Sequence, residues 1–327
     1  MLKVGVPDAV DPDLHRLLPG GISLELISLR PERMVEVEFW IAPPFTRHAQ
    51  QQVPFLRGLR VTQATVAGVD ALLKLVPPGV LLCDARGVHN ISTAEWTLAA
   101  ILASIKYFPL FGGLQRDGSW SRRLEAQERY YALHPPVKRP YPHILCEELH
   151  GQQVLIVGYG AIGRAIEERL QPFGVHFIRV ARNARDSAPG LEKVYGADSL
   201  PDLLPSADVV VLIVPFTSET TGMIGTKELA LMKHGALLVN AARGPVVNTD
   251  ALLAALNEGR IRAAIDVTDP EPLPDGHPLW SAPNLLITPH IASSTPMFMV
   301  RAMEFAASQI GRYLRGEPLE NVVSGEY

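Results

Sequence analysis

Residues 153–163 read Gln-Val-Leu-Ile-Val-Gly-Tyr-Gly-Ala-Ile-Gly, and this stretch decides the fold class of the chain. The segment before the glycines is almost entirely apolar, which is typical of a strand buried on both faces of a parallel sheet. Beyond the turn, apolar residues recur at helical spacing, at Ile162, Ile166, Leu170 and Phe173. The stretch therefore predicts a strand, a tight turn and an amphipathic helix in direct succession.

The same alternation continues through the second half of the chain. We expect strands at residues 175–180, 208–214, 236–240, 263–267 and 285–287, and helices at 249–257 and 296–314. Buried strands that alternate with helices indicate a parallel sheet covered on both faces. In the N-terminal third, shorter strands are expected at 2–6, 35–41, 59–66 and 80–83, followed by a helix over 94–105. The pattern predicts an α/β protein with a parallel sheet in its second half.

Residues 106–150 lack this alternation. They are basic and aromatic between residues 120 and 131, and they then contain four prolines, Pro135, Pro136, Pro140 and Pro142. Because prolines interrupt regular structure, we interpret this segment as an arm or connector with little regular core.

Composition excludes several classes of protein. The chain has 327 residues, 47% of them hydrophobic, and a net charge of −4. The length suggests two domains, and the charge argues against a basic surface for nucleic acid. The longest apolar runs are too short to span a bilayer, so we expect no membrane partner. The N-terminus lacks a signal-peptide pattern and there are two cysteines, which favours a reduced, cytoplasmic setting.

The glycine loop after the strand at 153–157 has the spacing G-x-G-x-x-G, in the strand-to-helix context that a dinucleotide site requires. The first glycine allows the tight turn, the second lets a pyrophosphate approach the backbone, and the third lets helix and strand pack closely. The helix N-terminus favours the phosphates. A purely structural turn is the alternative. We expect cofactor contacts from Gly158, Tyr159, Gly160, Ala161, Ile162 and Gly163.

The residues after the next strand bear on which dinucleotide binds. An NAD site places an acidic residue about 20 positions after the first glycine. Here the sequence runs Ala-Arg-Asn-Ala-Arg over 181–185, with no acid before Asp186. A guanidinium pairs well with a 2′-phosphate. We therefore favour NADP(H), with Arg182 as the chief contact and Arg185 as a second candidate. NAD(H) is the alternative if these arginines only form a solvated face.

Three polar residues follow the later strands and form a chemically coherent set. Arg243, Glu271 and His290 come after the strands at 236–240, 263–267 and 285–287. Ligands bind beyond the carboxyl ends of strands in such sheets, so we expect all three in one cleft. Arg243 can hold a substrate carboxylate, and His290 can pass a proton to a developing oxyanion. Glu271 can hydrogen-bond the imidazole and fix its tautomer.

Several long motifs now resemble a known family. They are the glycine loop, VPFTSETTGMI (214–224), LLVNAARGPVVNTDALLAAL (237–256), AIDVTDPEPLP (264–274) and HPLWSAPNLLITPHIA (277–292). In this order they resemble the D-isomer-specific 2-hydroxyacid dehydrogenases, especially NADP-using glyoxylate/hydroxypyruvate reductases. ATVAGVD (64–70) is similar, more loosely, to the family's substrate-carboxylate loop. The resemblance implies hydride transfer between a nicotinamide cofactor and a small 2-keto or D-2-hydroxy acid, with catalytic residues Arg243, Glu271 and His290.

The resemblance also implies the remaining site residues and the domain limits. Ala67 and Gly68 would bind the substrate carboxylate together with Arg243, and Asp266 would contact the nicotinamide amide. Further cofactor contacts would come from Asn90, Val214, Pro215 and Ala241. The fold would be α/β, with two doubly wound parallel-sheet domains. A flavodoxin-like substrate domain would comprise 1–98 and 292–327, and a Rossmann-type cofactor domain 99–291, including the arm at 106–150. The active site would lie in the cleft between them, and members of the family are usually homodimers.

Alternatives to this interpretation remain. The same fold serves as a dinucleotide-sensing corepressor, although the acid–base set argues against that role here. An NAD-linked phosphoglycerate- or lactate-type dehydrogenase is a second alternative. The loop at Pro43, Pro44 and Phe45 is expected to face the reacting carbon, and it shows no obvious arginine cluster for a phosphate. His143, Cys146 and His150 have ligand-like spacing but no fourth ligand in pattern, so we predict no metal site.

Overall fold

The structure is a computed structural model, described for residues 1–134, 143–186 and 192–324. The chain divides into two compact units, Met1–Asn90 with Ser294–Tyr327, and Ile91–Ser293. The expected boundary between residues 98 and 99 falls inside helix α2 (Asn90–Ile105). Nearly all of this helix belongs to the second unit, because it buries Ala94, Ile101 and Ile105 in that unit's core.

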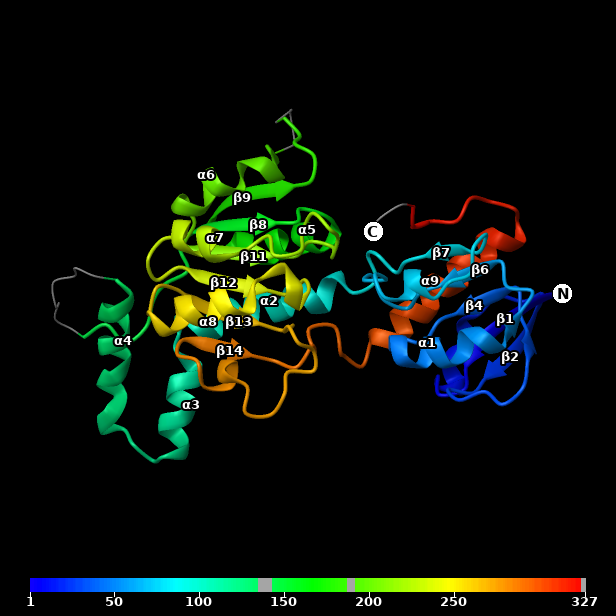
Figure 1. The fold of residues 1–327 in the computed structure, drawn as a ribbon, viewed down its shortest axis with the longest axis horizontal. Helices are drawn as coiled ribbons and strands as arrows, with labels where there is room; N and C mark the ends of the chain where they lie inside the picture. The colour runs from blue at the N-terminus through cyan, green and yellow to red at the C-terminus, as the bar shows by residue number, and fades with distance from the viewer. Residues whose placement is uncertain (135–142, 187–191, 325–327) are drawn as a thin grey trace. The chain divides into compact units, whose positions relative to one another are not determined.

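The second unit is built on a seven-stranded sheet in which every neighbouring pair is parallel (Figure 1). The strand order is β10-β9-β8-β11-β12-β13-β14. From β8, successive strands are added toward one edge of the sheet as far as β10. From β11, they are added toward the other edge as far as β14. The point where the direction reverses, between β8 and β11, is where ligands bind in doubly wound sheets. The strands are β8 (Gln153–Val157), β9 (His176–Ala181), β10 (Tyr195–Gly196), β11 (Val209–Leu212), β12 (Leu237–Asn240), β13 (Arg262–Ile265) and β14 (Leu285–Ile287).

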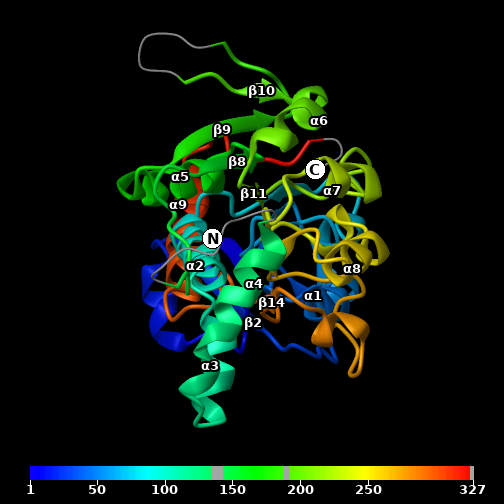
Figure 2. The same cartoon turned by 90° about the vertical axis from the view of Figure 1, so that its left-hand side faces the viewer.

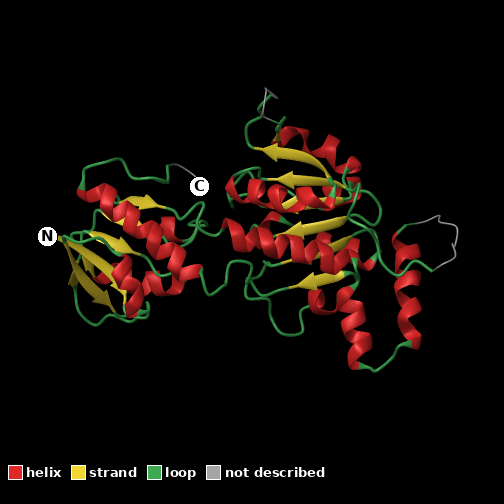
Figure 3. Ribbon diagram, turned by 180° about the vertical axis from the view of Figure 1, so that it is seen from behind, coloured by secondary structure: helices red, strands yellow, loops and turns green. Residues whose placement is uncertain are grey.

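The apolar strands are explained by burial on both faces of this sheet. Along β8, Val154 and Ile156 join one core and Leu155 and Val157 join another. Helices α2 and α5 (Ala161–Leu170) contribute to the first core. Helices α6 (Leu200–Leu203), α7 (Thr226–Leu231) and α8 (Thr249–Asn257) contribute to the second. Figure 3 shows helices on both sides of the strands in this unit. The predicted parallel sheet with two covered faces is confirmed.

The first unit has a five-stranded parallel sheet in the order β2-β1-β4-β6-β7. This is the flavodoxin-like order expected for the N-terminal domain. The edge strand β2 was not among the predicted strands, because it is mostly half-buried and its apolar residues are interrupted by polar ones. The expected strand at 35–41 is two short strands in different sheets, because β3 pairs with β5 instead. The elements are β1 (Leu2–Pro7), β2 (Ile22–Ile27), β3 (Val35–Glu36), β4 (Phe39–Ile41), β5 (Leu56–Arg57), β6 (Val61–Gln63), β7 (Leu81–Cys83), α1 (Thr46–Gln52) and α9 (Phe298–Leu314).

The arm is more regular than predicted. Instead of an irregular connector, the structure has helices α3 (Phe108–Arg116) and α4 (Glu125–Leu133), which extend from the second unit (Figure 2). The prediction was wrong because a small core of its own, centred on Tyr107, Ala126 and Leu133, stabilises the pair. The four prolines at 135–142 lie outside the described residues. Within the described ranges no single helix is long and apolar enough to cross a membrane, although α2 and α3, bent by 66°, pass that test as a pair.

Candidate active site

The glycine loop joins β8 to α5, and its three glycines have different structural roles. A Cβ on Gly158 would lie 2.4 Å from the carbonyl oxygen of Ile213, and Gly158 has a φ of +105°. A Cβ on Gly163 would lie 2.7 Å from the carbonyl oxygen of Gly158. A Cβ on Gly160 would meet nothing within 4 Å. Packing therefore requires the outer two glycines, whereas the middle one leaves open space at the N-terminus of α5, where a phosphate fits.

Of the two arginines after β9, Arg185 contacts this loop and Arg182 contacts a different segment. Arg185 donates from Nη2 to the carbonyl oxygen of Tyr159, within the glycine loop, at 3.2 Å. Nε of Arg182 lies 3.2 Å from Oε2 of Glu219, and both side chains are more than half exposed. Glu219 was not among the predicted site residues, although it lies in the quoted stretch 214–224. A 2′-phosphate at Arg182 would therefore have to compete with an existing carboxylate partner.

His290 and Glu271 form a direct pair. Nδ1 of His290 lies 2.6 Å from Oε1 of Glu271. Because an ionised carboxylate can only accept, Nδ1 carries the hydrogen and Nε2 is left for another partner. The hydrogen bond from His290 lowers the pKa of Glu271 against the opposing effect of burial, and the positive charges of His290 and Arg243 lower that pKa further. The carboxylate is thus held in its charged form beside the imidazole.

Arg243 reaches the same region through the loop after β12. The side chain of Asn240 holds this loop, with Oδ1 accepting from the Ala242 amide and Nδ2 donating to the Arg243 carbonyl oxygen, both at 3.0 Å. Gly244 allows the loop to pack on the segment after β13, because a Cβ there would lie 1.9 Å from the carbonyl oxygen of Thr268. This close approach brings the Arg243 loop beside the segment that carries Glu271.

Asp266, at the end of β13, organises the loop of His290. The side chain is 2% exposed. Its Oδ1 accepts from the amide of Ile291 at 2.9 Å and its Oδ2 from the amide of Ala292 at 2.8 Å. Its carbonyl oxygen accepts from the amide of His290 at 2.7 Å. His290 has a φ of +54°, a conformation that costs a non-glycine residue about 1–3 kcal/mol. The hydrogen bonds from the successive amides of residues 290–292 to Asp266 hold the backbone of His290 in this unusual conformation.

Comparison with known proteins decides the family. The profile described as "D-isomer specific 2-hydroxyacid dehydrogenase, NAD binding domain" matches residues 98–292, more than half of the chain. The chain belongs to the D-isomer specific 2-hydroxyacid dehydrogenase family. It is therefore an NAD(P)-dependent 2-hydroxyacid dehydrogenase, and the resemblance found in the sequence motifs is confirmed.

Individual relatives of this dehydrogenase differ in name. It is 36% identical over 251 residues to the glyoxylate reductase of Aeropyrum pernix, covering 76% of this chain and 70% of that protein. It is 30% identical over 336 residues to the D-3-phosphoglycerate dehydrogenase of Methanocaldococcus jannaschii, covering 99% of this chain and 60% of that longer protein. A solved D-isomer specific 2-hydroxyacid dehydrogenase from Xanthobacter autotrophicus Py2, in complex with NADPH and MES, has a TM-score of 0.75 at 28% identity, covering 98% of both chains.

The other residues predicted for this dehydrogenase are divided between its two units. Val214, Pro215 and Ala241 follow β11 and β12 at the carboxyl edge of the second unit's sheet. Ala67 and Gly68 follow β6 in the first unit, and both are half-buried. Asn90 begins α2, and its buried Oδ1 has no hydrogen-bond partner among the described residues. An unsatisfied buried acceptor at this position is compatible with a contact to the carboxamide of a nicotinamide.

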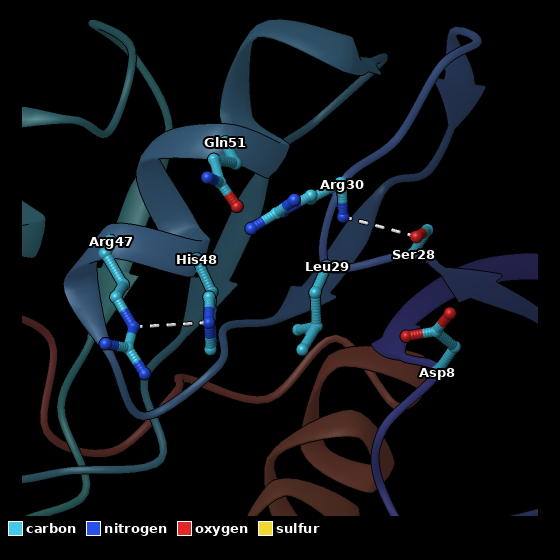
Figure 4. Close-up of a pocket in the computed structure, with 7 residues that line it drawn as sticks. All are labelled: Asp8, Ser28, Leu29, Arg30, Arg47, His48 and Gln51. Carbon is cyan, nitrogen blue, oxygen red and sulfur yellow. Dashed lines mark hydrogen bonds between the residues drawn. The ribbon is translucent and has the colours of Figure 1, made fainter.

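The first unit also contains a cavity of about 670 Å³ at the carboxyl ends of β1 and β2 and beside α1 (Figure 4). Arg30 and Arg47 both line it, and Nε of Arg47 donates to Nε2 of His48 at 3.3 Å. No sequence motif connects these two arginines, because they lie on separate segments. None of the predicted site residues lines this cavity; the lining residues are Asp8, Ser28, Leu29, Arg30, Arg47, His48 and Gln51.

Proposed function

We propose that this dehydrogenase reduces a small 2-keto acid, such as glyoxylate or hydroxypyruvate, with NADPH as the favoured cofactor and with Arg243, Glu271 and His290 as catalytic residues. The observation that carries the proposal is the 2.6 Å contact between His290 and Glu271, beside the charge of Arg243. The names of the relatives support a glyoxylate-type substrate, since several are glyoxylate reductases at about 35% identity.

The geometry supports a different chemical role for each of the three residues. With the Nδ1 hydrogen committed to Glu271, protonated His290 has its Nε2 hydrogen available for the substrate's carbonyl oxygen. The guanidinium of Arg243 can bind the carboxylate of the substrate and polarise the adjacent carbonyl. A bound nicotinamide supplies the hydride for the keto carbon. Ala67 and Gly68 would donate backbone amides to the same carboxylate, while Asn90 and Asp266 would face the cofactor.

The two units fit the two roles that the family resemblance implies. We propose that the unit Met1–Asn90 with Ser294–Tyr327 binds the substrate and that Ile91–Ser293 binds the dinucleotide. The glycine loop, Arg182 and Arg185 all lie in the second unit, which supports this division. We further propose a homodimer that uses the arm, where Phe108 at the start of α3 and Trp120 between α3 and α4 expose large apolar side chains.

A change at Arg182 should alter cofactor choice. Arg182→Ala removes the guanidinium proposed to pair with the 2′-phosphate, so the KM for NADPH should rise about tenfold or more, because a charge-assisted hydrogen bond contributes about 1.5–3 kcal/mol. The KM for NADH should change little. Glu219→Gln should have the opposite effect, since it removes the carboxylate that competes for Arg182. Steady-state kinetics with both cofactors, with Arg123→Ala as control, tests this; equal changes for NADPH and NADH would contradict it.

Arg243→Ala should raise the KM for 2-keto acids and lower kcat/KM, because the substrate's carboxylate loses its ionic partner. The assay follows absorbance of NADPH or NADH with glyoxylate, hydroxypyruvate, pyruvate and a phosphorylated keto acid. The phosphorylated compound is included because Arg30 and Arg47 line a cavity close to the loop at 43–45. If no 2-keto acid is reduced by the unmodified enzyme, the proposed function is wrong; if the phosphorylated acid is strongly preferred, the substrate assignment changes.

A further inference from the structure

A chain of hydrogen bonds links helix α2 to the loop that carries His290. The indole Nε1–H of Trp96 donates to Oγ1 of Thr288 at 3.0 Å, across 192 positions of sequence. The same hydroxyl donates to Oδ1 of Asp266 at 2.6 Å. Both oxygens of Asp266 also accept backbone amides, so the carboxylate acts as an acceptor throughout. The Thr288 hydrogen is therefore directed at Asp266, and a lone pair of its oxygen accepts from the indole.

The Asp266 carboxylate depends on this hydroxyl for its orientation. Each of its oxygens accepts one amide from the loop beyond His290, and Thr288 gives the shortest contact of the three. The side chain is almost completely buried, so water does not readily replace a lost donor. Without the hydroxyl, the carboxylate can rotate and release the amides of residues 291 and 292. His290 would then relax from its left-handed backbone conformation.

We propose that Trp96 and Thr288 are positioning residues. Acting through Asp266, they hold the imidazole of His290 in hydrogen-bond contact with Glu271. The inference rests on the proposed function and adds two residues to it. It also gives Asp266 a task beyond the predicted nicotinamide contact, because three acceptor positions of its carboxylate are occupied within the protein. Neither Trp96 nor Thr288 needs to touch the substrate or the cofactor for this role.

The chain offers variants that separate positioning from packing. The Trp96 ring packs against the core cluster of α2, α5 and the sheet, and phenylalanine keeps a ring there while removing the N–H donor. Thr288→Val removes the hydroxyl at nearly constant volume, and Thr288→Ser restores it.

Kinetics with NADPH and the preferred keto acid provide the first test. We expect kcat to fall roughly tenfold or more in Thr288→Val and several-fold in Trp96→Phe, because misplacement of a reacting group by about 1 Å can cost 10²-fold. In Thr288→Val the thermal midpoint of unfolding should fall, because a buried hydrogen bond to a charged group is lost, whereas the KM for NADPH should change much less than kcat does. Thr288→Ser should recover most of the rate. In a His290→Ala background, Thr288→Val should cause no further loss; an equal loss there would overturn the inference.

A measurement without turnover keeps the inference testable independently of the proposed function. Side-chain NMR of the free protein should show a Nδ1–H resonance of His290, protected by its bond to Glu271 and assigned by its absence in His290→Ala. We expect this signal in the unmodified protein and in Thr288→Ser, and its loss in Thr288→Val. If the signal persists in Thr288→Val, the positioning role is wrong even when the enzyme is active. If the unmodified protein reduces no keto acid, the proposed function fails, while the spectra still decide the positioning role.

Discussion

His290→Ala is expected to lower kcat by about 10²–10⁴-fold, the usual contribution of a general acid that is correctly placed. The side chain is half exposed, and its Nδ1 lies 2.6 Å from the carboxylate of Glu271. Removing it therefore leaves no buried group unsatisfied and should change stability little. Because Nδ1 is occupied by the carboxylate, Nε2 is the atom whose loss accounts for the lost rate.

The controls for His290→Ala distinguish proton transfer from general damage. His176→Ala alters an exposed histidine at the start of β9 and should leave kcat unchanged. The KM for NADPH should be similar in both variants and in the unmodified enzyme. The kcat of Glu271→Gln should lie between those of His290→Ala and the unmodified enzyme, since the amide can still contact the imidazole but no longer stabilises its positive charge. A kcat for His290→Ala within a few-fold of the unmodified enzyme would remove the proposed general acid.

Arg262→Ala is expected to lower the free energy of unfolding by about 3–5 kcal/mol, the usual cost of removing one partner of a buried ion pair. Arg262 binds Glu147 through Nη1 at 2.8 Å and Nη2 at 3.2 Å, and its Nε donates to the carbonyl oxygen of Gly235 at 3.0 Å. The side chains of the pair are only 5% and 9% exposed. The variant would leave the Glu147 carboxylate buried without its guanidinium. Urea unfolding measures the loss.

The loss in Arg262→Ala should depend on pH in a defined direction. Burial acts to raise the pKa of Glu147, but contacts with His134, Arg262 and Tyr107 outweigh it and hold the pKa below its usual value. A carboxyl with a lowered pKa stabilises the folded state above its unfolded-state pKa, and this contribution is lost as the pH falls through the folded-state value. The difference between Arg262→Ala and the unmodified protein should therefore be largest near neutral pH and shrink below about pH 4.5.

An exposed ion pair provides the comparison for Arg262→Ala. Arg122 contacts Asp117 and Glu125 on the arm, and all three side chains are about half exposed. Arg122→Ala should lower the free energy of unfolding much less than Arg262→Ala does, because water screens such exposed pairs. A similar small effect for Arg262→Ala, or a loss that does not vary with pH, would show that the buried pair is not what anchors β13 to the segment before β8.

The parts of the fold predicted from sequence are those encoded by short, contiguous patterns. The expected limits of the strand at 153–157 and of the helix at 249–257 agree with β8 and α8. A strand buried on both faces must be apolar along its whole length, so its sequence alone identifies it. The arm was predicted poorly because its helices are stabilised by contacts between Tyr107 and residues near 126 and 133, which no local pattern reveals.

For this protein the sequence by itself determined the doubly wound sheets, the glycine loop and the identity of Arg243, Glu271 and His290 as a candidate set, because each lies in a local motif with a recognisable spacing. Only the tertiary structure decided that Nδ1 of His290 faces Glu271, that Glu219 competes for Arg182, and that Trp96 reaches Thr288. These contacts join residues on different elements. Their existence depends on how strands and helices pack, and packing is a property of the whole chain.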